Sequence, residues 1–348
     1  MRLRAATALL AAVASATTLA ACGGTNTGDT AGTITVSTWG GDFTAAEKKW
    51  FGDPFTAETG IKVEYRALST SPMTPVLLQA QSGDVKVDVV DAESPAVLRS
   101  KNLLAPFPPE LMRKLQETSR PESFLPDAMK IGQTGMVIAC NPDLVRRCPE
   151  SPQQFWDVDA YPGRRGILVG LPQTVLDFAL VADGVSPAQV YPLDIDRAIG
   201  KLHRIKPQVA VWAQSPAQAQ QLLADKEVGI EYIDHPGAFL VQRNRIPNLK
   251  VSWAGSMSTN DAMVVTRDAP NKAAAFAYLS WIADHPKNQA GWAEALTYST
   301  PTTRLRELVP PATWDALPAA HSSTAEDDQW LVAHLPEVQR AFQRFTAG

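Results

Sequence analysis

The chain has 348 residues, of which 45% are hydrophobic and 20% charged, and 36 acidic against 32 basic side chains give a net charge of −4. This composition is typical of a soluble globular protein, and the length favours two lobes over a single core. An acidic balance without clustered Lys and Arg argues against binding to nucleic acid, whose phosphates require a basic surface.

The first 21 residues have the parts of an export signal. Arg2 and Arg4 supply positive charge, an apolar run follows up to Ala21, and small side chains precede Cys22. A membrane span needs about 20 strongly apolar residues, and this run consists largely of alanine. We therefore expect a removable signal peptide over residues 1–21.

The end of this segment resembles a bacterial lipobox, Leu19-Ala20-Ala21-Cys22. In a lipobox the cysteine thiol takes a diacylglycerol and becomes the new N-terminus. Residues 22–32 are rich in Gly and Thr, which is typical of a flexible tether. We expect an exported protein that a lipid on Cys22 anchors to the extracytoplasmic side of the cell membrane. The alternative is a plain signal peptide with an incidental cysteine.

From residue 33 onward, strand patterns alternate with helix patterns. A β-rich run over 33–39 ends at two glycines, and Thr44 with Glu47 forms a capping box that predicts a helix start. The further elements predicted in this half are strands at 61–66, 87–90 and 135–140, and helices at 73–81 and 95–101. This order implies parallel strands covered on both faces.

Two cysteines remain after Cys22, and they flank a short turn. Cys140 and Cys148 are separated by a segment that begins Asn141-Pro142-Asp143, which is turn chemistry. We expect a disulfide between them because the exported compartment is oxidising; the alternative is two unrelated buried thiols. No His/Cys cluster has the spacing of a metal site, and no cofactor is expected.

A second α/β set follows. It consists of strands at 166–169, 209–212, 228–233 and 262–265, and helices at 174–182, 195–203, 217–224, 273–283 and within 325–345. Strand-like passages near 132–139 and 258–265 join the two sets. The sequence thus predicts an α/β fold with two lobes and a ligand site between them.

Several short segments together resemble bacterial extracellular solute-binding proteins of the spermidine/putrescine-binding type. They are Trp39-Gly40-Gly41, Glu58–Val63, Phe155-Trp156-Asp157, Tyr161–Arg165 and Asn271–Ala275. The resemblance implies a bilobal type II periplasmic-binding-protein fold, with two α/β lobes joined by crossover hinge strands. Lobe 1 would comprise 33–135 with 259–308, and lobe 2 would comprise 136–258 with 309–348.

The same resemblance implies a receptor rather than an enzyme. Such a protein is a monomeric component of an ABC importer that binds a small solute and delivers it to permease and ATPase subunits. Motifs such as Gly-x-Ser-x-Gly and His-Glu-x-x-His are missing from the sequence, which makes an exported hydrolase the least favoured alternative.

Three candidate ligand residues fall in the first lobe. Trp39 ends the first strand, where ligands collect in open α/β sheets, and its ring could stack on a cationic amine. Asp261 matches the acidic residue that anchors an amine in the family, and Glu93 matches a loop position that contacts the ligand. The alternatives are a core tryptophan, a turn-capping aspartate and a solvated loop glutamate.

Three more candidates fall in the second lobe. Asp234 ends a strand at a position where the family often has tryptophan, Tyr232 shares its side of that strand, and Trp212 matches a family tryptophan that lies either in the core or in the cleft. With these residues, a polyamine or a related small amine is the expected solute. An amino-acid-like zwitterion, a phosphonate or a ferric ion remains the alternative.

Overall fold

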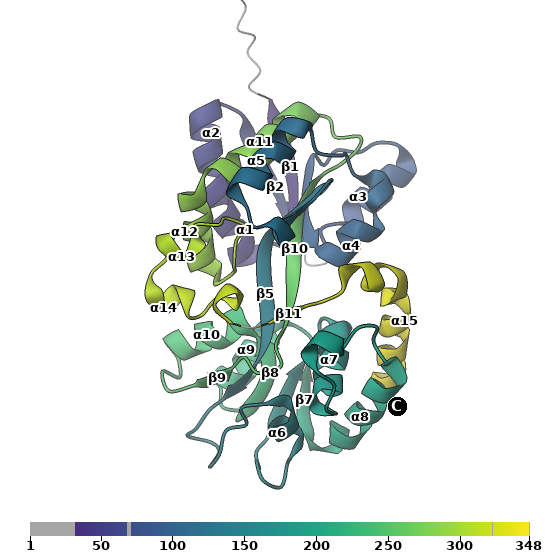
Figure 1. The fold of residues 1–348 in the computed structure, drawn as a ribbon, viewed down its shortest axis with the longest axis vertical. Helices are drawn as coiled ribbons and strands as arrows, with labels where there is room; N and C mark the ends of the chain where they lie inside the picture. Colours follow the sequence, from purple (N-terminus) through teal and green to yellow (C-terminus); the bar gives the residue numbers. More distant parts are fainter. Residues whose placement is uncertain (1–31, 68–70, 322, 348) are drawn as a thin grey trace, which may run out of the picture. The chain divides into compact units, whose positions relative to one another are not determined.

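One path of paired strands runs through the chain, as Figure 1 shows for the computed structural model. The structure describes residues 32–67, 71–321 and 323–347. The expected signal peptide, the lipidation of Cys22 and all but the last residue of the tether at 22–32 therefore lie outside the described residues.

The strand order is β2-β1-β3-β10-β5-β8-β6-β7, with β11 on β10 and both β4 and β9 on β5. The strands are β1 (Thr33–Thr38), β2 (Lys62–Ala67), β3 (Val89–Glu93), β4 (Phe124–Leu125), β5 (Ala128–Cys140), β6 (Arg165–Leu168), β7 (Val209–Ala213), β8 (Ile230–Asp234), β9 (Lys250–Ser252), β10 (Met257–Val265) and β11 (Thr324–Ala325). As predicted, β1 pairs in parallel with β2 and β3.

Strand β5 belongs to both halves of the fold. Positions 129–135 pair with β10, whereas positions 136–140 pair with β8. Strand β10 also pairs with β3 of the first half. The two passages predicted near 132–139 and 258–265 are thus two adjacent antiparallel strands that join two α/β lobes, which confirms the predicted fold class.

Helices cover the sheet. The α-helices are α1 (Gly41–Glu47), α2 (Asp53–Thr59), α3 (Thr74–Ser82), α4 (Ser94–Arg99), α5 (Pro109–Thr118), α6 (Pro152–Trp156), α7 (Pro172–Ala182), α8 (Ile195–Ile205), α9 (Pro216–Ala224), α10 (His235–Asn244), α11 (Lys272–Asp284), α12 (Pro286–Leu296), α13 (Leu305–Leu308), α14 (Pro311–Trp314) and α15 (Asp328–Ala347). The shorter helices are η1 (Lys48–Gly52), η2 (Lys101–Leu103), η3 (Pro121–Ser123), η4 (Pro187–Gln189), η5 (Lys206–Gln208) and η6 (Pro318–Ala320). Helices α5, α6, α10, α12, α13 and α14 were not predicted.

The capping box predicted at Thr44 is wrong. Helix α1 begins at Gly41, and the Thr44 hydroxyl oxygen accepts a hydrogen bond from the Gly40 N–H at 2.9 Å. The sequence rule placed the helix start late because it takes Thr with Glu three residues on as an entry signal. Glu47 is therefore a helix-interior residue, and its carboxyl is free for another role.

Each lobe has its own hydrophobic core. In the first lobe, Phe55 and Tyr278 meet edge to face with ring centroids 5.2 Å apart. In the second lobe, Phe178 and Tyr232 stack face to face at 3.8 Å. Aromatic pairs of this kind contribute roughly 0.5–1.5 kcal/mol beyond their buried area.

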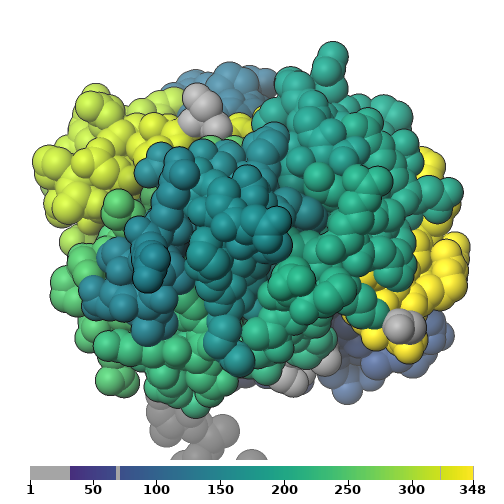
Figure 2. Space-filling view, turned by 90° about the horizontal axis from the view of Figure 1, so that it is seen from below, coloured from purple at the N-terminus to yellow at the C-terminus, as the bar shows by residue number. Residues whose placement is uncertain are grey.

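Helix α15 contacts both lobes (Figure 1). At its start, Asp328 accepts a hydrogen bond from the Ser94 hydroxyl and forms an ion pair with Lys130 at 2.9 Å. Towards its end, Phe342 and Phe345 join the core of the second lobe. Figure 2, seen from below, shows residues of the second lobe in teal over much of the near face and the end of α15 in yellow at its margin.

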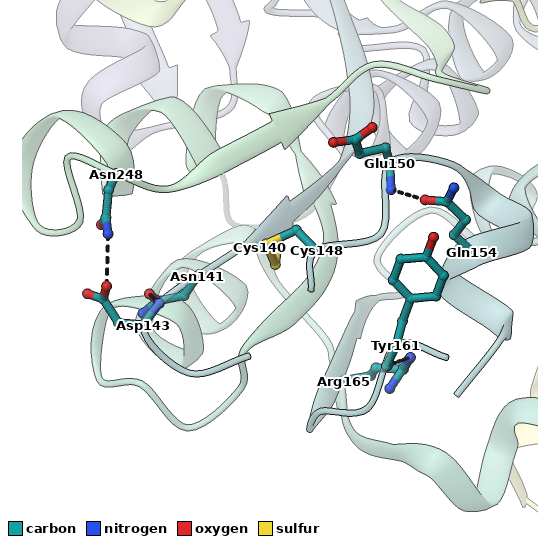
Figure 3. Close-up of a disulfide and its surroundings, with 9 residues drawn as sticks. All are labelled: Cys140, Asn141, Asp143, Cys148, Glu150, Gln154, Tyr161, Arg165 and Asn248. Carbon is teal, nitrogen blue, oxygen red and sulfur yellow. Dashed lines mark hydrogen bonds between the residues drawn. A yellow bond between two sulfur atoms is a disulfide. The ribbon is translucent and has the colours of Figure 1, made fainter. Parts of the chain in front are cut away.

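The predicted disulfide between Cys140 and Cys148 is present, with the two Cα atoms 5.7 Å apart. Figure 3 shows how the loop that it closes is tied down. The Asn141 side-chain oxygen accepts a hydrogen bond from the Asp143 N–H, and the Asp143 carboxylate accepts one from the Asn248 amide at 2.9 Å. The turn residues between the cysteines thus hold the loop as the sequence suggested.

Candidate functional site

The chain turns abruptly from β1 into α1, and Trp39 stands at that turn. Gly40 and Gly41 have φ angles of 88° and 56°, a region that favours glycine. They allow the helix to start directly after the strand end. Trp39 is partly exposed, and its indole N–H is shielded from solvent and lies close enough to the Asp261 carboxyl to lower its pKa.

Three acidic side chains lie on one face of the sheet close to Trp39. In the antiparallel register of β3 and β10, Glu93 is opposite Asp261 and Asp91 is opposite Met263. Because side chains alternate along a strand, Asp91, Glu93 and Asp261 project to the same side. Asp91 is fully buried, Asp261 is 9% exposed, and Glu93 is half-buried.

Glu47 adds a fourth acid from α1. It is fully buried, and its carboxylate accepts a short hydrogen bond from the Thr38 hydroxyl. The sequence contains a signal for it, because Phe43, Glu47, Trp50 and Phe51 follow the i, i+4, i+7, i+8 spacing of a core-facing helix stripe. A glutamate within an apolar stripe is a candidate functional acid, and its place in an apparent capping box concealed that signal.

Burial dominates the electrostatics of these acids. Burial raises the pKa of Glu47 to about 8, against the effect of the Thr38 hydrogen bond. Burial and the neighbouring Glu47 carboxyl raise the pKa of Asp91 well above its ordinary range. Burial, followed by the charges of Asp91 and Glu93, raises the pKa of Asp261, while the nearby Trp39 indole N–H lowers it.

No cation of the protein compensates these groups within the described ranges. None of the ion pairs there includes Glu47, Asp91 or Asp261. Both Asp91 carboxyl oxygens and one Glu47 oxygen are buried and have no hydrogen-bond partner in the described part of the chain. Buried acids in this state require a proton or an external cation. We refer to Glu47, Asp91 and Asp261 as the acidic triad.

Tyr298 connects the acidic triad with the second lobe. Burial, followed by the charges of Asp261, Asp234 and Asp91, raises the pKa of Tyr298 well above its ordinary range, so its hydroxyl lies within the electrostatic range of all three carboxyls. Asp234 caps α10, where one carboxyl oxygen accepts a hydrogen bond from the Gly237 N–H at 2.9 Å, while the other has no partner among the described residues. The structure therefore brings Asp234 and Asp261 to one neighbourhood.

Glu93 faces a groove at the edge of this neighbourhood. Its carboxylate accepts a hydrogen bond from Ser71 at 3.2 Å, and the groove is also lined by Arg99 of α4 and Leu335 of α15. Burial raises the pKa of Glu93, and the Ser71 hydrogen bond and the Arg99 charge lower it. Glu93 thus lies between the acidic triad and a solvent-accessible groove.

Tyr232 and Trp212 have packing partners away from the acidic triad. Tyr232 is 1% exposed, stacks on Phe178, and donates a hydrogen bond from its hydroxyl to the Thr174 carbonyl at 3.0 Å. Trp212 is partly exposed and meets the Phe345 ring of α15 edge to face at 5.3 Å. The structure does not bring either side chain together with Asp261.

The second lobe and the segment before α15 bury acids of another kind. Glu231 is fully buried, and neither of its carboxyl oxygens has a hydrogen-bond partner in the ranges that the structure describes. Burial, followed by the Asp234 charge, raises its pKa to about 9. Asp177 accepts a hydrogen bond from the Tyr191 hydroxyl at 3.4 Å. Burial, followed by the charge of Asp177, raises the pKa of Glu326.

Two features are absent from the described ranges. No group of three or more His, Cys, Asp or Glu side chains there has an arrangement that could hold a metal ion. No helix there is both long and apolar enough to cross a membrane.

The sequence matches a known protein family over most of its length. Residues 50–321 match the profile of a family described as bacterial extracellular solute-binding protein. The gamma-aminobutyric acid-binding protein of Pseudomonas aeruginosa is 29% identical over 333 residues, which cover 90% of this chain and 91% of that protein.

Solved structures give a consistent comparison. A gamma-aminobutyric acid (GABA) receptor of known structure has a TM-score of 0.81 at 28% identity and covers 89% of this chain and 96% of its own. The periplasmic binding protein AgtB from A. tumefaciens R10, solved in complex with agropinic acid, has a TM-score of 0.76 at 26% identity and covers 91% and 99%. These relatives are solute-binding proteins, which points away from an enzyme.

Proposed function

Because the chain belongs to the family of bacterial extracellular solute-binding proteins, which serve ABC importers, we propose that it captures a small aliphatic solute with a primary ammonium group. A polyamine or a related small amine, GABA included, fits this description. The observation that carries the proposal is the acidic triad beside Trp39. The triad has no ion-pair partner among the described residues, and of its three side chains Glu47 and Asp91 are fully buried while Asp261 is 9% exposed.

The ammonium group would lie against Asp261 with its charge directed towards Asp91. An external cation compensates the buried acids, and a charge-assisted hydrogen bond to Asp261 fixes its position. The Trp39 ring offers an aromatic face for the same cation. Glu93 and Asp234 would lie near the remainder of the solute, where two further carboxyls favour a second ammonium group, as in putrescine, over a carboxylate.

The second lobe would close over the bound solute. A ligand that contacts both lobes only in the closed state shifts the population towards that state. This proposal includes the division into two lobes. Lobe 1 comprises 33–135 with 259–308, and lobe 2 comprises 136–258 with 309–348. The separate hydrophobic cores support this division, although Val309 and Leu317 pack with Leu305 and α12 of the first lobe. Tyr232 and Trp212 would then support the closing lobe from within, through Phe178 and Phe345.

Calorimetric titration of the purified domain provides the test. GABA, putrescine and butyrate share a four-carbon chain and differ in charge, so they separate a cation site from an anion site. We expect heat and a raised melting temperature with at least one of the two amines and none with butyrate. Binding of butyrate, sugars or phosphonates without any amine would overturn the proposal.

A lipid on Cys22 is the second part of the proposal, and it rests on the lipobox-like sequence alone. The anchor would keep the receptor beside its permease and raise its local concentration there. Labelling with a palmitate analogue should mark the wild-type protein and not Cys22→Ser. Equal labelling of both would remove the anchor and leave solute binding untouched.

A further inference from the structure

Glu47 is fully buried beside the other two acids of the acidic triad. Thr38 at the end of β1 donates a hydrogen bond to one of its carboxyl oxygens, and the other oxygen has no partner among the described residues. Burying an acid that faces two further acids costs free energy unless a proton or a cation compensates its charge. The groups packed around Glu47 indicate how that cost is offset.

The groups that face Glu47 are acids and hydroxyls. Asp91 of β3 and Asp261 of β10 are the nearby carboxyls, and Tyr65 of β2 and Tyr278 of α11 share a hydrogen bond at 2.9 Å within electrostatic reach of Glu47. Burial raises the pKa of both tyrosines well above the ordinary range, so they stay neutral. The three carboxyls of the triad, and Glu93, whose charge acts on Asp91 and Asp261, are therefore the groups here that can exchange a proton near neutral pH.

Three carboxylates this close cannot all be charged in a buried site without a cation, because like charges in a poorly solvated region repel strongly. The empty site must therefore retain at least one proton on the acidic triad. When a positively charged ammonium group binds, the carboxylates no longer need that proton to reduce their mutual repulsion.

We propose that Glu47 is a specificity-determining positioning residue: when an ammonium group binds at Asp261 and Asp91, the Glu47–Asp91 pair releases one proton to solvent, so the site selects cations over neutral isosteres. The charge balance is one cation in and one proton out. Glu47 acts through Asp91 rather than by contacting the solute. This inference rests on the proposed amine-binding function.

Linkage fixes the sign of the pH dependence. If binding releases a proton, affinity rises as the pH rises through the range in which the free site is still protonated. The pKa of Glu47 in the free protein, about 8, sets the upper end of that range. Below that pH, the dissociation constant should fall about tenfold for each unit by which the pH rises, if one full proton is released.

Calorimetry of the full chain with the amine that binds best, repeated at pH 7 in buffers of different ionisation enthalpy, counts the protons. We expect about one proton released per bound amine for the wild type. Glu47→Gln removes one of the two carboxyls of the releasing pair, so the count should fall below the wild-type value and the affinity should depend less on pH. A wild-type count near zero with tight amine binding would overturn this inference alone, whereas absence of amine binding would overturn the proposed function.

Two further variants separate proton release from folding. Glu231→Gln neutralises another fully buried glutamate, in the second lobe, and should leave the proton count at the wild-type value. Thr38→Val removes the hydrogen bond that favours charged Glu47 and should move the midpoint of the pH profile upward. If Glu47→Gln fails to fold, the Thr38→Val shift still tests the assignment, and an unchanged midpoint contradicts it.

Discussion

The two lobes bury acids in different ways. In the first lobe, the fully buried Glu47 and Asp91 lie next to two residues that keep contact with solvent, Asp261 at 9% exposed and the partly exposed Trp39. In the second lobe, Glu231 and Asp177 are sealed in the packing of the core. The raised pKa values are similar in kind, and burial causes both. Access from solvent, and not the pKa shift, therefore distinguishes a candidate ligand site from a structural acid.

The largest expected effect is that of Asp261→Ala on amine affinity. Loss of the partner of a desolvated ammonium costs about 3 kcal/mol, or about 100-fold in the dissociation constant. Calorimetry measures it, with Glu231→Gln as the matched variant that should bind as the wild type does. Equal losses in both variants would erase the distinction between the two kinds of acid.

A change confined to the second lobe should affect stability and not affinity. The double variant Cys140→Ser with Cys148→Ser removes the cross-link of a short loop and should lower the free energy of unfolding by roughly 2–3 kcal/mol. Denaturant unfolding measures the loss, and the amine dissociation constant at low temperature should stay within about twofold of the wild type. A large loss of affinity would show that the loop contributes to binding.

Glu231 should make stability depend on pH. Its pKa is raised from 4.5 to about 9 in the folded protein, so its favourable contribution is complete below pH 4.5 and is lost as the pH rises towards 9. Glu231→Gln keeps a neutral side chain throughout. The free energy of unfolding of the Glu231→Gln variant should exceed that of the wild type by about 2 kcal/mol at pH 8. Urea titrations at pH 5 and pH 8 check this, and an advantage that is no larger at pH 8 than at pH 5 contradicts it.

The smallest expected effect is that of Trp39→Phe, which keeps an aromatic ring and removes the indole N–H. That N–H lowers the pKa of Asp261, so its loss makes the carboxylate less available to an ammonium. We expect about 1 kcal/mol, or roughly fivefold weaker amine binding. Trp39→Leu should weaken binding further because the ring is lost as well. No effect from either variant would place Trp39 outside the site.

The sequence predicted the parts of the molecule that local chemistry decides. Strand and helix periodicity gave most of the elements, turn residues indicated the disulfide between Cys140 and Cys148, and resemblance to a family identified Trp39 and Asp261. These features depend on residues that are close together in the chain or on short segments that resemble the family. They include the general fold and the position of the first-lobe candidates.

Only the tertiary structure decided which acids are neighbours. Glu47, Asp91 and Asp261 come from a helix and two strands, and the antiparallel register of β3 and β10 brings the last two to one face of the sheet. Tyr232 alternates correctly along its strand, yet its ring stacks on Phe178 because α7 packs on that face. Periodicity states which side a residue faces and not what covers that side, since the covering element lies far away in the sequence.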